Sequence, residues 1–141
     1  MGNDLAAFAA EMVRLDSRSA VSNLAVAARV EAELAGFDVE RLDYADAAGV
    51  AKRVLVAHRG GPGGLALSAH MDTVPETGWT DDPWSGAIRD GVLHGLGSAD
   101  MKGPLAAIIR AAQAAPRATL VLTTDEETTK AGAREVVARS A

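Results

Sequence analysis

Residues 65–124 constrain the fold more than any other part of the chain, because they read as a strand, a helix and a second strand in succession. The run 65–69 is short and apolar, residues 102–115 have helical periodicity, and residues 119–124 are rich in β-branched side chains. Two strands of one sheet that are joined through a helix run parallel in a right-handed crossover. The pattern predicts an α/β fold in which a mixed, largely parallel sheet is flanked by helices.

Further elements are predicted on both sides of this unit. They are helices near residues 5–13, 23–35 and 131–138, strands at 37–44 and 54–57, and a short hairpin around residues 90–91 inside the loop 73–97. Only 4% of the residues are aromatic and 48% are hydrophobic. The core is therefore predicted to consist of alanine, valine and leucine, which allow helices to pack closely on a sheet.

Charge and composition exclude several classes of protein. The net charge is −5 and the lysines and arginines are not clustered, so we expect no nucleic-acid partner. The absence of cysteine excludes thiolate chemistry and disulfides. No apolar stretch approaches the ~20 residues of a transmembrane helix, and the first residues lack the basic segment of a secretory signal. We expect a soluble, cytoplasmic protein with no membrane partner.

Three clusters of polar side chains lie at the predicted strand ends or in the loop between them. They are His70-Met71-Asp72, Asp100-Met101-Lys102-Gly103 and Asp125-Glu126-Glu127. In open α/β sheets, ligand sites lie outside the carboxyl ends of the strands. A site without cysteine must use imidazole and carboxylate ligands, which suit zinc or a similar divalent ion. Asp72, two residues after His70, is predicted to accept a hydrogen bond from the imidazole and to orient it.

Each cluster also has a structural explanation. Acidic residues before a helix commonly form an N-cap and a first turn that the helix dipole favours, and a histidine after a strand is commonly a surface residue or a satisfied core residue. Adjacent carboxylates diverge, so one of Glu126 and Glu127 is predicted to bind metal while the other handles protons. Lys102 and Lys130 are interpreted as solvated, or as countercharges for neighbouring carboxylates.

Three longer strings resemble the motifs of a known enzyme family in the same order and spacing. They are SAHMDTVP at 68–75, HGLGSADMKG at 94–103 and TDEE at 124–127. On these motifs, the chain resembles the dinuclear-zinc deacylase and carboxypeptidase family. The resemblance implies two Zn²⁺ (or Co²⁺) ions. It also implies a cis peptide bond after the residue that bridges them.

The site residues follow from the resemblance, position by position. It implies that His70 binds one zinc, that Asp100 bridges both ions and that Glu127 binds the other. Glu126 would be the general base, and Asp72 the residue that orients His70.

The implied reaction is hydrolysis of the amide bond of an N-acyl amino acid. The string Gly95-Leu96-Gly97 and the stretch 126–134 are most similar to the acetylornithine deacetylase branch. That branch would convert N-acetylornithine to ornithine and acetate in arginine biosynthesis. The alternatives are a succinyl-diaminopimelate desuccinylase or carboxypeptidase relative, or a short non-catalytic α/β domain.

The resemblance also bears on domain organisation. It implies that residues 1–141 are the N-terminal portion of a catalytic domain. The remainder of that domain, with two further ligands, and a lid domain that makes the complete enzyme a homodimer would lie outside them. The isolated chain is therefore expected to be inactive.

Overall fold

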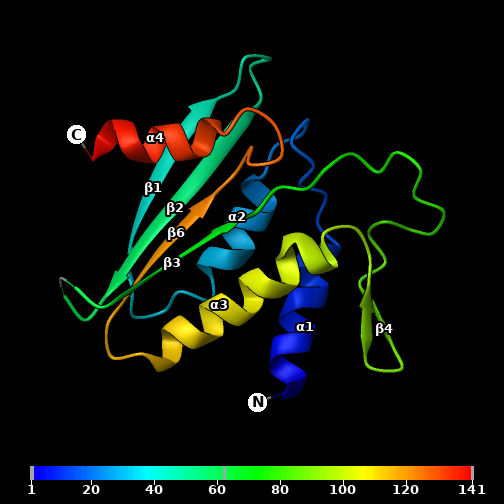
Figure 1. Cartoon of the computed structure of the whole chain (residues 1–141), viewed down its shortest axis with the longest axis horizontal. Coiled ribbons are helices and arrows are strands. Elements are labelled where there is room, and N and C mark those ends of the chain that lie inside the picture. Colours follow the sequence, from blue (N-terminus) through cyan, green and yellow to red (C-terminus); the bar gives the residue numbers. More distant parts are fainter. Residues whose placement is uncertain (1, 62, 141) are drawn as a thin grey trace.

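A computed structural model describes residues 2–61 and 63–140 and contains a four-stranded sheet with helices on both faces (Figure 1). The helices are α1 (Gly2–Val13), α2 (Leu24–Glu31), α3 (Gly103–Ala114) and α4 (Ala131–Arg139), with an irregular, kinked turn η1 (Ser98–Lys102) before α3. The strands are β1 (Asp38–Ala45), β2 (Ala51–Arg59), β3 (Leu65–His70), β4 (Ala87–Arg89), β5 (Val92–His94) and β6 (Ala118–Thr123).

The sheet has the order β1-β2-β6-β3 and confirms the predicted mixed sheet with flanking helices. Strands β3 and β6 are parallel, as the crossover through α3 requires. The expectation of a largely parallel sheet is wrong, because β1–β2 and β2–β6 are antiparallel. A short turn at 46–50 joins β1 to β2, and such a short connection permits only antiparallel pairing.

The main core lies between the sheet and the helices α1, α2 and α3. Alternate residues of the two central strands, including Leu55, Ala57, Leu120 and Leu122, point to this face and are buried. Alanine, valine and leucine dominate it, as predicted. Helix α4 lies across the opposite face (Figure 1), where Gly132 approaches Val54.

The remaining predicted elements are present with shifted ends. The predicted helix 23–35 is regular only to Glu31, and the strand predicted at 54–57 extends over all of β2. The predicted hairpin is formed by β4 and β5, which pair antiparallel. Across residues 2–61 and 63–140, no helix combines the length and the apolar character needed to cross a bilayer.

Candidate metal centre

The carboxyl ends of β3 and β6 bring two of the polar clusters side by side. His70 is the last residue of β3 and pairs in register with Thr123 of β6. The 125–127 turn, which carries Glu126 and Glu127, therefore starts beside the segment His70–Asp72. The strand–helix–strand pattern predicted this neighbourhood, and the register of the parallel pair creates it.

The third cluster is brought to the same place by η1. Gly97, which precedes this turn, has a φ of +79°, and a Cβ there would lie 2.5 Å from Thr73 Cγ2. Only glycine combines this backbone conformation with such a close approach. The peptide bond between Asp100 and Met101 is cis, as the family resemblance implied. Asp100 thus reaches the end of β3 from a loop that packs tightly on it.

His70, Asp100 and Glu127 each present one ligand atom, and these atoms all lie within 4.8 Å of one another. His70 Nε2 is 3.0 Å from Asp100 Oδ1. Zinc–nitrogen and zinc–oxygen bonds are about 2.0–2.2 Å long, so side chains this close can bind one ion or two neighbouring ions that share a carboxylate. The donor set of one imidazole and two carboxylates fits a divalent cation of the zinc type.

His70 is oriented by the main chain of Asp72. His70 Nδ1 lies 2.9 Å from the Asp72 carbonyl oxygen and 3.5 Å from the Asp72 Oδ1 atom. A ring nitrogen that donates to a fixed acceptor leaves Nε2 available for a metal. Asp72 therefore lies where the sequence predicted, but the shorter contact comes from its backbone.

The Asp72 carboxylate is buried and holds the neighbouring turn. It accepts hydrogen bonds from the amides of Glu126 and Glu127, both at 3.1 Å, and from the Ser19 hydroxyl at 2.7 Å. Burial alone would raise the pKa of Asp72, but His70, Ser19 and the two amides outweigh it and lower the pKa. The carboxylate stays ionised and fixes the backbone from which both glutamates project.

The pKa values of His70 and Glu127 reflect the crowding of charges in this cluster. Burial opposes the charged imidazole, but the contacts with Asp72 and Asp100 raise the pKa of His70 to about 9. Partial burial and the nearby Asp100 carboxylate raise the pKa of Glu127. Two carboxylates this close favour a shared cation, because a positive charge relieves their repulsion.

Glu126 is directed differently from Glu127. Its carboxylate is 2.7 Å from the Lys130 ammonium, so Lys130 is a countercharge, one of the two roles considered for it. Glu126 also lines an open cavity of about 330 Å³ together with Ser68, His70, Asp100 and Thr123. Adjacent glutamates thus occupy separate places, one in the ligand cluster and one facing the cavity beside it.

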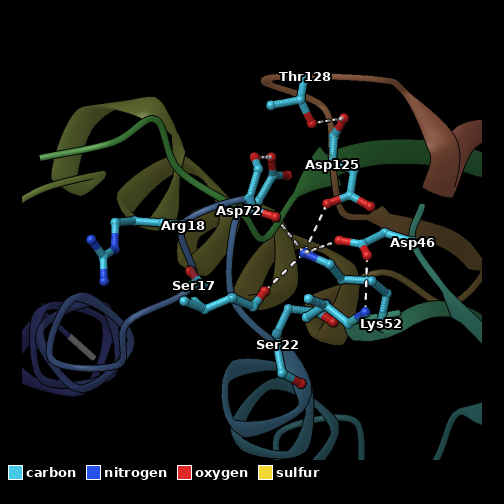
Figure 2. A network of polar contacts seen from close by, with 12 residues as sticks. Ser17, Arg18, Ser22, Asp46, Lys52, Asp72, Asp125 and Thr128 are labelled. Carbon is cyan, nitrogen blue, oxygen red and sulfur yellow. Dashed lines mark hydrogen bonds and ion pairs between the residues drawn. The ribbon is translucent and has the colours of Figure 1, made fainter. Parts of the chain in front are cut away.

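Other residues around the centre were not identified from the sequence. A polar network around Asp125 contains Lys52, Tyr44 and Ser19, and Figure 2 shows part of it. No sequence pattern marks these three residues. Lys102 was interpreted as solvated or as a countercharge, but it is buried and donates to the Leu15 carbonyl at 2.6 Å.

Comparison with known proteins reveals relatives of two enzymatic kinds. The chain is 41% identical over 133 residues to a succinyl-diaminopimelate desuccinylase of Xanthobacter autotrophicus, covering 86% of this chain and 35% of the relative. It is 45% identical over 108 residues to an acetylornithine deacetylase of Photorhabdus laumondii, covering 70% and 28% respectively. The chain spans about a third of the length of these relatives.

The fold and the motifs agree with this grouping. A solved tripeptidase from Staphylococcus aureus superposes with a TM-score of 0.63 at 25% identity, covering 93% of this chain and 38% of the tripeptidase. The model of peptidase family M20/M25/M40 matches residues 66–141, which contain all three polar clusters. The chain therefore belongs to peptidase family M20/M25/M40.

Proposed function

We propose that the protein containing this chain is a metal-dependent hydrolase that cleaves the amide bond of an N-acyl amino acid. The observation that carries this proposal is the convergence of His70, Asp100 and Glu127 to within 4.8 Å, with Glu126 facing the adjacent cavity. Family membership supports the same class of reaction.

As the family resemblance implies, His70 would bind one ion and Glu127 the other, and Asp100 would contact both. Divalent ions bound there would polarise the substrate carbonyl and lower the pKa of a water molecule toward ~7. Glu126 would take a proton from that water and return it to the leaving amine. Asp72 would keep the imidazole and both glutamates in place through the contacts described above.

N-acetylornithine is the substrate that we favour, with ornithine and acetate as products. The acetylornithine deacetylase of Photorhabdus laumondii is 45% identical over the aligned residues. A second candidate substrate is N-succinyl-diaminopimelate, because a desuccinylase is 41% identical over a longer alignment. Both substrates present an amide next to an amino-acid carboxylate, so the site chemistry is common to them.

The test is hydrolysis by the full-length gene product loaded with Zn²⁺ or Co²⁺. N-acetylornithine, N-succinyl-diaminopimelate and a tripeptide are compared at equal concentration. We expect the highest kcat/KM for N-acetylornithine, and Glu126→Ala should lose orders of magnitude in kcat while it retains metal. Turnover of none of these substrates by metal-loaded enzyme would contradict the proposal. We expect negligible turnover by the 141-residue chain alone.

A further inference from the structure

A buried lysine contacts Asp125 and joins separate segments of the chain (Figure 2). The Lys52 side chain, on β2, has no exposed surface. Its ammonium donates to the carbonyl oxygens of Ser19 at 2.6 Å and Val21 at 2.8 Å. It also forms an ion pair with the buried Asp125 carboxylate at 3.0 Å, and Asp46 lies 3.9 Å away.

One side of this contact leads to His70. The Ser19 residue that accepts from Lys52 donates its own hydroxyl to the Asp72 carboxylate at 2.7 Å. Asp72 in turn holds the imidazole of His70 through its carbonyl oxygen. Two residues, Ser19 and Asp72, therefore connect Lys52 to His70 through hydrogen bonds.

The other side leads directly to the glutamates. Asp125 immediately precedes Glu126 and has a φ of +60°. The Tyr44 hydroxyl donates to the second carboxylate oxygen of Asp125 at 2.7 Å, and the Asp125 carbonyl oxygen accepts from the Lys130 amide at 2.8 Å. The side chain and the main chain of Asp125 are thus both held at the start of the turn.

Stability alone does not account for such a pair. Replacing a buried ion pair by apolar groups of similar size is often neutral or stabilising, whereas removing one partner leaves an uncompensated buried charge. Lys52 and Asp125, together with Ser19, do connect the turn that carries Glu127 to the segment His70–Asp72, and apolar groups would not fix the relative position of these two segments with the same directionality.

We propose that Lys52 is a positioning residue that, through Asp125 and Ser19, keeps the 125–127 turn in place against the segment His70–Asp72. Glu127 then reaches the ligand cluster and Glu126 faces the cavity. The catalytic consequence rests on the proposed function, but the positional claim holds for the metal-free chain as well.

The first test is amide hydrogen exchange in the metal-free 141-residue chain. The amides of Glu126 and Glu127 donate to Asp72, so their protection reports the position of the turn. We expect Lys52→Met to lower their protection about tenfold relative to amides of β6. Val30→Ala, a core change on α2, should lower all protection together and keep this ratio. An unchanged ratio in Lys52→Met would overturn the proposal.

The double variant Lys52→Met/Asp125→Asn separates position from stability. Removing both charges should restore the free energy of unfolding toward that of wild type, because no buried charge is left unpaired. The relative protection of the Glu126 and Glu127 amides should stay low. Recovery of that protection together with stability would show that Lys52 acts only on stability and would refute a positioning role.

Zn²⁺ affinity measured by titration calorimetry links the position of the turn to the metal. Lys52→Met and the double variant should bind Zn²⁺ about 10- to 100-fold more weakly than wild type, and Val30→Ala should not. Equal affinities in wild type and Lys52→Met would count against the proposal. These titrations use the full-length gene product, and if its wild-type form binds no Zn²⁺, the proposed metal centre fails, while hydrogen exchange in the 141-residue chain still decides the role of Lys52.

Discussion

At the residue scale, Asp72 serves the centre with two different groups. Its carbonyl oxygen orients His70, while its carboxylate accepts the amides of Glu126 and Glu127. The spacing of two residues after His70 was sufficient to predict that Asp72 lies beside the imidazole. Which oxygen makes the contact depends on the backbone torsions of a loop, and these are not encoded in residue spacing.

The burial of Lys52 depends on long-range contacts and has no local sequence signal. A lysine in a strand is normally solvated, and the apolar pattern predicted only residues 54–57 as strand. Its burial depends on Asp125, which reaches it only because β2 and β6 pair in the sheet. Long-range pairing of this kind leaves no local pattern in the sequence.

The raised pKa of His70 predicts a pH-dependent stability of the metal-free chain. The folded pKa of about 9 exceeds the ordinary 6.5, so the folded state binds the proton more tightly than the unfolded state. The stabilisation is complete below pH 6.5 and is lost as the pH rises toward 9. We expect the free energy of unfolding in urea to fall by about 2 kcal/mol from pH 6 to pH 8.

His70→Asn is the control for this measurement, because it removes the titrating imidazole. Its stability should be nearly flat over the same interval. Burial lowers the pKa of Lys102 to about 8. Deprotonation of Lys102 therefore raises the free energy of unfolding above that pH, so pH 8 is the useful upper limit. An equal decline in His70→Asn would exclude His70 as the source.

At the element scale, helical periodicity and strand runs predicted nearly every helix and strand of the described chain. The parallel pairing of β3 with β6 followed from the intervening helix, and with it the neighbourhood of the polar clusters. The sequence did not predict the direction of β2 relative to β6. No short turn links these two strands, because β3, the loop and α3 lie between them in the chain. The sequence therefore predicted which polar clusters lie together at the ends of β3 and β6, but it did not predict the antiparallel direction of the other strands.

Contact between α4 and the end of β6 gives a prediction at this scale. A Cβ on Gly132 would lie 2.5 Å from the carbonyl oxygen and 2.8 Å from the amide nitrogen of Thr124. Backbone atoms cannot yield as a flexible side chain can, so Gly132→Ala should cost about 2–3 kcal/mol of unfolding free energy. The change would also displace the 125–127 turn.

Gly49→Ala is the matched substitution. Gly49 has a φ of +80° with nothing within 4 Å of the added Cβ, so only backbone strain of about 1 kcal/mol is expected. Urea unfolding measures both variants. A Gly132→Ala protein no less stable than Gly49→Ala would show that α4 can shift freely from the strand end.

At the scale of the whole molecule, the described sheet has β3 at its edge. This strand pairs only with β6 among the residues that the structure covers, and Leu65 is 56% exposed. Open edge strands pair readily with other chains. We expect the 141-residue chain to self-associate with rising concentration in sedimentation experiments, and Leu65→Lys to reduce this association.

Val92→Lys provides a control of equal exposure, since Val92 on β5 is 57% exposed and lies outside the four-stranded sheet. It adds the same charge away from the β3 edge and should leave association unchanged. If both lysine variants lower association equally, net charge and not the strand edge controls it.

We propose that the adjacent glutamates have different roles, Glu127 as a metal ligand and Glu126 as the general base. Zn²⁺ titration of Glu127→Gln and Glu126→Gln in the full-length gene product distinguishes these roles, because the two substitutions are chemically identical. Glu127→Gln should lose more affinity than the roughly 10- to 100-fold typical of an outer-shell partner, and Glu126→Gln should keep the wild-type affinity. Equal losses, or the larger loss in Glu126→Gln, would contradict this assignment.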